Sequence, residues 1–388
     1  MLPNPYTPRT ATENPVGRER LLRTINQVIS PVRTTGKPAQ GGVVLYGVRG
    51  IGKTSILRAV QAKEAQNGFI TVWTAAAKRA SYLDGLVEGI RNALVANAIV
   101  RPGDTWSREL GLELNLGIIK ANAKTTRKEP TSPPVDSAWN VARLENLLRG
   151  ATKKCVEHSG GRGAGLLLFV DELHAVKQNE LAIFLNALQN ISDDRLDPVP
   201  FMFIGAGLPA VKKISTMAAT FGERTLFREV GLLHDNDVMS AIVDPALEMG
   251  VHYSDDAAVK LVELSKGYPF FTQLYAFNAW DEVEPNFGQV IALDDVEKSL
   301  ADSSYDVKHL FQSRLGAATK EELRFIYALA ELGGDNPVKR EDIVGVLQKD
   351  ISNVRQQLIA KAVITEAEHG YVKFTIPGFA DFVLSERN

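Results

Sequence analysis

Cysteine is nearly absent from this sequence, since Cys155 is the only one among 388 residues. A single thiol forms neither an intrachain disulfide nor a cysteine-based zinc site, which favours a reducing compartment. An excess of charge of one sign is also lacking, because 44 Lys and Arg residues face 46 Asp and Glu residues. This balance removes the electrostatic argument for general binding to nucleic acids or membrane surfaces, so any DNA contact must be local.

Long hydrophobic runs are missing as well. The longest nearly apolar stretch, Pro198–Val211, is shorter than the roughly 20 residues of a membrane-spanning helix, and it contains Gly and Pro. The first 15 residues are polar and rich in proline, without the apolar core of a secretion signal. We therefore expect a cytoplasmic protein without membrane contact.

What the sequence does contain is an alternation of strand-like and helical patterns. At roughly 150 residues per domain, its length predicts two or three domains. Strands are expected at 43–46, 69–73, 166–170 and 200–204, and helices at 18–29, 55–66 and 180–191. This order predicts an α/β domain over residues 1–231 with a parallel sheet covered by helices. An inserted hairpin near residues 108–134 is expected to interrupt it.

From residue 232 onward, helical patterns predominate. Periodicity predicts helices at 238–249, 256–265, 270–283 and 294–315, and hence a helical domain over residues 232–315. Shorter helices follow at 319–332, 340–347 and 353–362, the first opened by the capping-box spacing of Thr319 and Glu322. A hairpin-like pair around His369 and Gly370 completes the tail. Residues 316–388 are therefore predicted to form a winged helix-turn-helix domain.

The strongest chemical signal lies between the first predicted strand and the helix after it. The sequence there matches GxxxxGK[ST], the P-loop or Walker A motif, over Gly47, Val48, Arg49, Gly50, Ile51, Gly52, Lys53 and Thr54. Its glycines let backbone N–H groups curl around phosphate oxygens, and the following helix adds the partial positive charge of its N-terminus. Lys53 is expected to reach the β and γ phosphates, Thr54 to bind Mg²⁺, and Ser55 to contact the nucleotide.

A second motif ends the strand predicted at 166–170, where Asp171 and Glu172 follow five apolar residues. This pattern is typical of a Walker B strand, whose carboxyl end lies beside the P-loop. Asp171 is expected to hold the magnesium shell, and Glu172 to orient and polarise the attacking water. His174 follows closely and is interpreted as an exposed loop or helix-start residue.

These motifs resemble those of the AAA+ and STAND-type P-loop ATPases, particularly the initiator-like or archaeal-type branch with a C-terminal winged helix. Val16, Gly17 and Arg18 look like part of the hhGRE motif that borders the adenine in these families. Gly267-Tyr268-Pro269 looks like the lid motif that closes over the nucleotide, with Pro269 at the contact. The resemblance implies a P-loop ATPase core, a helical lid and a winged helix, with ATP or ADP and Mg²⁺ as cofactors.

In such families an arginine after the fourth strand often serves as a finger on the γ phosphate. Arg224 and Arg228 occupy the corresponding region, so the resemblance implies that one of them neutralises this charge, within one chain or across an oligomer interface. The sequence departs from the family pattern at sensor 1, where Phe203–Pro209 offers no Asn, Thr or Arg at the strand end. A slow or inactive ATPase is therefore one interpretation.

The predicted winged helix favours DNA, because the second helix of such a motif normally enters the major groove. Val354, Leu358 and Ile359 are expected to pack inward, and the outward candidates for DNA contact are Asn353, Arg355, Gln356, Gln357 and Lys361. Basic residues do not outnumber acidic ones in the tail, so a protein-binding winged helix stays open as an alternative. The basic cluster Lys120, Lys124, Arg127 and Lys128 is interpreted as a solvated loop, with DNA contact as its alternative.

The sequence thus predicts a magnesium-dependent ATP-binding switch whose winged helix reports the nucleotide state. Duplex DNA, a protein partner and a nucleotide-dependent oligomer are its expected partners. The alternative is a signalling or defence regulator that is held closed by its nucleotide and binds a protein through the winged helix.

Overall fold

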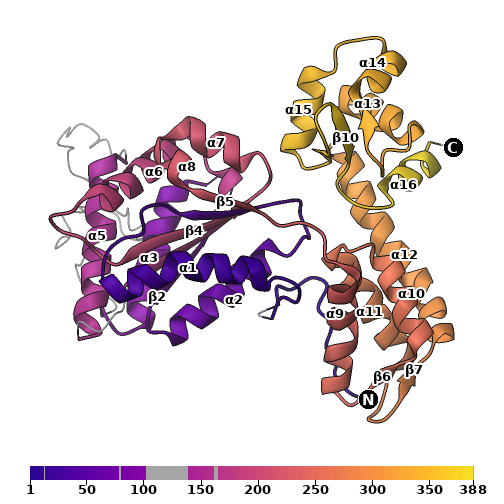
Figure 1. Ribbon diagram of the computed structural model, residues 1–388, viewed down its shortest axis with the longest axis horizontal. Coiled ribbons are helices and arrows are strands. Elements are labelled where there is room, and N and C mark those ends of the chain that lie inside the picture. The colour runs from indigo at the N-terminus through magenta and orange to yellow at the C-terminus, as the bar shows by residue number, and fades with distance from the viewer. Residues whose placement is uncertain (13, 78–79, 102–138, 161–164, 388) are drawn as a thin grey trace, which may run out of the picture.

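The computed structural model describes the chain except for residues 13, 78–79, 102–138, 161–164 and 388. The described elements form three groups: a sheet covered by helices, a group of helices, and a smaller C-terminal unit (Figure 1). The long helix α12 (Leu293–Gly316) runs from the second group into the third. The expected hairpin near 108–134 and the basic cluster Lys120, Lys124, Arg127 and Lys128 lie outside the described residues.

The first group is built on a five-stranded parallel sheet in the order β2-β3-β4-β1-β5. Its strands are β1 (Val43–Tyr46), β2 (Ile70–Ala75), β3 (Leu166–Asp171), β4 (Phe201–Gly207) and β5 (Leu226–Glu229). In register, Val43 of β1 lies opposite Ile204 on one side and Leu226 on the other. The α/β prediction is thereby confirmed, and the carboxyl ends of β1, β3 and β4 meet at one edge.

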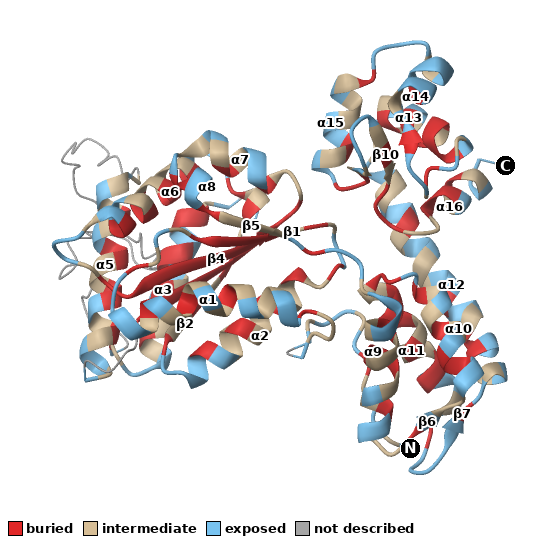
Figure 2. Ribbon diagram, viewed as in Figure 1, coloured by how far each residue is buried: buried red, intermediate tan, exposed pale blue. Residues whose placement is uncertain are grey.

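Helices cover both faces of this sheet, which explains why its central strands β3 and β4 are buried throughout (Figure 2). One face packs against α1 (Glu19–Thr35) and α2 (Lys53–Gln66). The other packs against α3 (Tyr82–Ala96), α5 (Val141–His158), α6 (Gln178–Asp193), α7 (Val211–Ala218) and α8 (Phe221–Arg224). Sequence patterns did not predict α3 or α5, although Ser81 and Asn140 cap them through side-chain oxygens.

Helix α1 is longer than its pattern predicts, because it continues through Pro31 to Thr35. The polar stretch that was expected to end it at Ile29 contains the buried Val32, which packs against the sheet. Gly36 then ends the helix in the left-handed conformation, φ +66°, and its N–H bonds to the Val32 carbonyl. The burial of Val32 thus accounts for a helix that continues past Pro31, although proline often ends or kinks a helix.

The second group consists of α9 (Asp235–Glu248), α10 (Asp255–Ser265), α11 (Pro269–Val283) and the first part of α12. These helices match the predicted pattern, and two short strands, β6 (His252–Tyr253) and β7 (Val290–Ile291), add a parallel pair that it did not include. Their shared core is centred on Trp280. Residues 1–12, the N-terminal arm, lie along this group and insert Tyr6 into its core.

The C-terminal unit combines helices with a three-stranded antiparallel sheet in the order β8-β10-β9. Its elements are α13 (Lys320–Glu331), β8 (Val338–Lys339), α14 (Arg340–Leu347), α15 (Ser352–Ala360), β9 (Ile364–Glu366), β10 (Tyr371–Phe374) and α16 (Phe379–Ser385). Leu358 is buried and Val354 and Ile359 pack beside it, so their inward orientation is confirmed. Phe311 of α12 packs against Phe379 and Phe382, which joins this unit to α12.

Among the described residues, no helix combines the length and the apolar character that crossing a membrane requires.

The capping box of α13 provides a pH-dependent test of the C-terminal unit. Glu322, whose side chain is 1% exposed, accepts hydrogen bonds at 2.7 Å from both Thr319 N and Lys361 Nζ. Burial alone would raise the pKa of Glu322, but these two donors lower it below its ordinary value. The resulting stabilisation is complete above the unfolded-state pKa near 4.5 and is lost as the pH falls through the lower folded-state value.

We expect Lys361→Met to lower the free energy of unfolding at pH 7 by about 1–3 kcal/mol, since a buried carboxylate loses a charged donor. The acid-induced loss of stability below pH 4.5 should be smaller in the variant than in the wild type. Urea unfolding of the full chain between pH 3 and pH 7 measures both effects. Equal stability of the two proteins at pH 7 would contradict the assignment.

Candidate nucleotide-binding site

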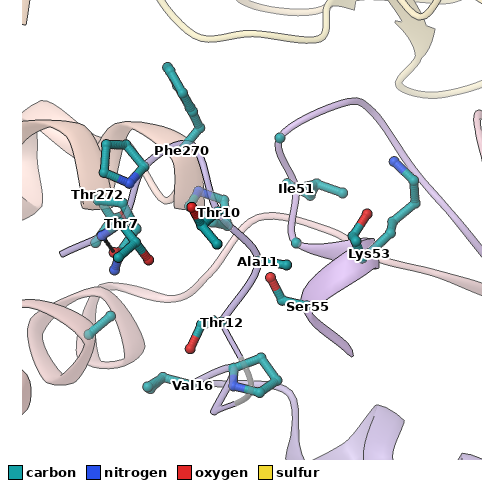
Figure 3. A pocket seen from close by; sticks show the side chains of 18 of the residues that line it. Thr7, Thr10, Ala11, Thr12, Val16, Ile51, Lys53, Ser55, Phe270 and Thr272 are labelled. Atoms are coloured by element: carbon teal, nitrogen blue, oxygen red, sulfur yellow. Dashed lines mark hydrogen bonds between the residues drawn. The ribbon is translucent and has the colours of Figure 1, made fainter. Parts of the chain in front are cut away.

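A cavity of about 650 Å³ lies at the carboxyl edge of the sheet, where the sheet meets the second group. The P-loop forms one wall, and α9 and α11 contribute to the opposite side. The N-terminal arm passes between α11 and the P-loop, with Thr10 and Ala11 facing Ile51 and Ser55 across the cavity (Figure 3). Its volume lies within the range of small-molecule and cofactor sites.

The backbone of the P-loop requires glycine at two places. Gly50 has φ +77°, and a Cβ there would lie 2.6 Å from Tyr268 Oη. Gly52 has φ +94° and immediately precedes α2, whose first N–H groups are free to bind an anion. The loop therefore presents backbone donors and a helix N-terminus to the cavity, the arrangement that binds phosphate.

Lys53 is buried at the base of this loop. Its Nζ donates to the carbonyls of Gly47 at 3.0 Å and Val48 at 2.7 Å. Burial lowers the pKa of Lys53 to about 8, while the carboxylates of Glu172 and Asp171 offset part of that shift. A bound anion would stabilise the charged form of this amine, because a nearby opposite charge offsets the cost of burial.

Thr54 and Asp171 meet beside Lys53, although they belong to different elements. Thr54 Oγ1 donates to Asp171 Oδ2 at 2.7 Å, and Asp171 is 8% exposed at the end of β3. A hydroxyl and a carboxylate oxygen in contact are hard ligands of the kind Mg²⁺ prefers. These two residues therefore fit the magnesium site that the motifs predict.

Glu172 follows Asp171 and lines the cavity. Its backbone is left-handed, with φ +53°, and its side chain is 38% exposed. His174 Nε2 lies 3.3 Å from Glu172 Oε2, and the His174 side chain is only 9% exposed. The expectation that His174 is exposed to solvent is therefore wrong, because the short helix η1 (Leu173–Ala175) turns its ring into the protein.

Arg18 and Tyr268 each donate a hydrogen bond to a carbonyl of the P-loop. Arg18 Nη2 donates to the carbonyls of Ile51 at 3.1 Å and Gly231 at 2.9 Å, and burial lowers the pKa of this arginine while Asp237 opposes that shift. Tyr268 donates its hydroxyl hydrogen to the Arg49 carbonyl, and Pro269 starts α11 directly after it. The segment of Val16, Gly17 and Arg18 and the segment Gly267-Tyr268-Pro269 therefore both contact the P-loop.

Most of the residues predicted to bind the nucleotide line the cavity: Val16, Arg18, Arg49, Gly50, Ile51, Gly52, Lys53, Thr54, Ser55 and Pro269. Gly17, Gly47 and Val48 are adjacent to the lining but not part of it. Gly17 has φ +70°, and a Cβ there would lie 2.6 Å from the Asp237 carboxyl carbon. The close approach of Asp237 explains why position 17 is a glycine.

The two arginines after β4 are not brought to this cavity in one chain. Arg224 precedes β5 and therefore lies at the amino edge of the sheet, where it pairs with Asp193 and its carbonyl abuts Gly41. Arg228 lies within β5 opposite Leu45, and its Nη1 donates to the Phe227 carbonyl. The position of Arg224 excludes its contact with the P-loop of its own chain, and a contact across an interface stays a prediction.

Sequence patterns missed one wall of the cavity and one cation near the P-loop. Arg314, in the last turn of α12, is partly buried and lies close enough to Arg49 and Lys53 to repel both. Burial lowers the pKa of Arg314, Tyr268 opposes that shift, and Arg49 adds to it. The N-terminal arm supplies Thr7, Thr10, Ala11 and Thr12 to the cavity wall. Neither Arg314, a basic residue in the last turn of α12, nor the proline-rich arm belongs to a motif that signals a pocket.

The predicted DNA-contact residues on α15 divide into two kinds. Asn353, Gln356 and Gln357 are exposed. Arg355 is 17% exposed and pairs with Glu366, and Lys361 bonds to Glu322 and to the Ala317 carbonyl. Both cations are thus engaged in ion pairs within the C-terminal unit, and the Lys361 side chain is 41% exposed.

The site and the fold together define a P-loop nucleoside triphosphatase. Residues 14–204 match the family model of the AAA ATPase domain, and residues 308–383 match a domain of unknown function (DUF8462). This match includes the P-loop and the strands β1 to β3, so the AAA ATPase domain model describes the N-terminal part of the chain.

Two solved structures share the overall fold with this chain. A Walker-type ATPase of Pyrococcus abyssi is 14% identical, with a TM-score of 0.62 over 97% of this chain and 98% of that one. Cdc6p from Pyrobaculum aerophilum is 14% identical, with a TM-score of 0.50 over 100% of this chain and 99% of that one. No curated protein matches the sequence. At this identity the likeness concerns the fold alone.

Proposed function

We propose that the protein is a magnesium-dependent ATP hydrolase that works as a molecular switch. ATP binds in the cavity between the P-loop, the N-terminal arm and α11, with its phosphates on the N-terminus of α2. Lys53 binds the β and γ phosphates, and Thr54 and Asp171 hold Mg²⁺, which would neutralise phosphate charge. Glu172 orients and polarises the attacking water. The bond of Thr54 to Asp171 and the position of Glu172 on the cavity support these roles.

The domain arrangement that accompanies this proposal has three parts. Residues 1–231 are the ATPase core with an insertion near 108–134, residues 232–315 the helical lid, and residues 316–388 a winged helix domain. The element order α13, β8, α14, α15, β9, β10 supports the last assignment, because three helices and a three-stranded antiparallel sheet in this order are typical of winged helix domains.

One observation carries the switch: α12 joins the helical group to the C-terminal unit, and its last turn places Arg314 near the cations of the P-loop. Val296 lies in the core of the helical group, and Phe311 packs against Phe271 of α11 and Phe379 of α16. Arg314, one turn further, lies near Arg49 and Lys53. Cations that repel one another attract a polyanion, so ATP draws Arg314 toward the P-loop and hydrolysis releases it. Movement of α12 is then transmitted to the C-terminal unit through the Phe311 contacts.

The target of the switch in this proposal is duplex DNA. The amides of Asn353, Gln356 and Gln357 form the exposed polar face of α15, and Asn and Gln side chains suit hydrogen bonding to adenine edges. A finger arginine, Arg224 or Arg228, would act across the interface of a nucleotide-dependent oligomer.

The second candidate is a nucleotide-held regulator of STAND type whose C-terminal unit binds a protein. The ion pairs of Arg355 with Glu366 and Lys361 with Glu322 favour it, because they remove positive charge from the helix that would enter the groove.

ATP hydrolysis measured with and without duplex DNA, at low and moderate salt, tests the proposal and separates these candidates. DNA should raise turnover, and Asn353→Ala with Gln356→Ala should weaken DNA binding about tenfold. Gln66→Ala, which removes an exposed amide at the end of α2, is the matched control and should change nothing. ATP binding without any DNA binding or stimulation would favour the protein-binding regulator.

A further inference from the structure

His174 connects two strands of the sheet at the candidate site. Its Nδ1 accepts a hydrogen bond from the backbone N–H of Leu208 at 3.2 Å, and its Nε2 lies 3.3 Å from Glu172 Oε2. A ring nitrogen that accepts a hydrogen bond carries no hydrogen, so the neutral imidazole carries its hydrogen on Nε2. This nitrogen lies beside the Glu172 carboxylate, so the ring connects the residue after β4 with the residue after β3.

The end of β4 explains why such a bridge is needed. This strand lies between β1 and β3, but its last residues, Gly205, Ala206 and Gly207, offer no polar side chain toward Glu172. Leu208 follows them, and its backbone N–H is the donor that this edge supplies to His174. His174, which follows the Walker B strand β3, thereby supplies the polar contact to Glu172 that the end of β4 lacks.

Glu172 itself depends on neighbouring contacts for its conformation. A left-handed backbone, φ +53°, is sparsely populated by glutamate and persists where the surroundings fix it. Glu172 N donates to Asp171 Oδ1 at 2.8 Å, and the Glu172 carbonyl accepts from Ala175 N at 2.7 Å. These bonds fix the backbone, whereas the half-exposed carboxylate is held by His174.

We propose that His174 is a positioning residue that holds the Glu172 carboxylate toward the phosphate end of the cavity. In this role His174 acts through Glu172. The inference rests on the proposed function, because the orientation of Glu172 matters for turnover only if this carboxylate orients the attacking water.

Two amide variants separate the two halves of the bridge. In His174→Gln the side-chain nitrogen takes the place of Nε2 and still donates to Glu172, while the bond from Leu208 is lost. In His174→Asn the side-chain oxygen takes the place of Nδ1 and still accepts from Leu208, while the shorter side chain does not reach Glu172. Both replace imidazole by an amide, so each is the matched control of the other.

We expect His174→Gln to keep kcat within a few-fold of wild type, and His174→Asn and His174→Ala to lower it about 10- to 100-fold without changing the Kd for ATP. Single-turnover hydrolysis of radiolabelled ATP measures the rates, equilibrium titration the affinities, and thermal unfolding verifies that each variant is folded. Equal rates in the Gln and Asn variants would overturn the inference, because a purely structural histidine has no preference between them. If the Asn variant does not fold, the Gln and Ala variants are compared in the same way.

The same measurements in a Glu172→Gln background distinguish the two levels of the proposal. His174→Asn should have no further effect there, because the group it positions has already been replaced. A further decrease in kcat would show that His174 affects turnover by a route other than Glu172. If Glu172→Gln alone turns over like wild type, the proposed function fails; if it is impaired while His174→Asn is not, only the role of His174 fails.

Discussion

Replacement of Glu172 by Gln is expected to lower ATP turnover by about 10²- to 10⁴-fold and to leave the affinity for ATP unchanged. The amide keeps the size of the side chain and its contact with His174, but it cannot accept a proton from water. Glu172 faces the cavity beside the buried Lys53, so the change acts where the γ phosphate would lie. Steady-state hydrolysis and equilibrium ATP binding, both with Mg²⁺, measure the two quantities.

Lys53→Ala is the control for this experiment because it should lose ATP binding as well as turnover. Its side chain supplies the charge that the phosphates require. The ATP hydrolysis rate of a folded Lys53→Ala variant therefore gives the background that does not come from this site. Turnover of Glu172→Gln at the wild-type level would remove the Walker B assignment, and a rate that falls together with ATP affinity would make Glu172 a binding residue.

The nucleotide site was predictable from sequence where local chemistry determines it. The glycines, Lys53 and Thr54 must follow one another for the backbone to turn around a phosphate, and Asp171 must end a buried strand to reach the same edge. The bond between Thr54 and Asp171 has the geometry that this argument requires.

The remaining parts depend on contacts between distant segments, which no local pattern encodes. His174 turns inward because Leu208, at the end of another strand, donates to it. Arg355 and Lys361 are drawn into ion pairs by Glu366 and Glu322, although helical spacing alone made them candidates for DNA contact. Arg224 lies before β5 and not after it, so the direction of one edge strand placed it away from the P-loop.

The N-terminal arm is the largest contribution that the sequence concealed. A polar, proline-rich segment without periodicity is typical of an extended tail, yet Tyr6 is 1% exposed within the helical group. Its ring packs edge-on against Trp280, with centroids 6.0 Å apart, and its hydroxyl donates to the Ile242 carbonyl. Burial raises the pKa of the Tyr6 hydroxyl, so the group stays a donor. Asn4 and Thr7 add hydrogen bonds to α11 on either side of this anchor.

Tyr6→Ala is therefore expected to reduce the free energy of unfolding by about 3–5 kcal/mol, the range for truncation of a fully buried aromatic side chain. Tyr6→Phe keeps the ring and loses only the bond to the Ile242 carbonyl, which should cost about 1 kcal/mol. Tyr305→Ala is the matched control, since this tyrosine on α12 is 72% exposed and its removal should change stability by less than about 0.5 kcal/mol. Urea unfolding of the full chain compares the three variants.

The same variant tests whether the arm is a wall of the nucleotide site. Tyr6 anchors the arm to the helical group, and residues 10–12 cross the cavity a few positions later. Release of the anchor should free this wall and weaken ATP binding, whereas Tyr305→Ala should leave it unchanged. Stability that falls without any change in ATP affinity would make the arm a structural strap alone. A Tyr6→Ala protein as stable as Tyr305→Ala would show that the arm is not docked, and the ATP site would then be open on the side that faces α11.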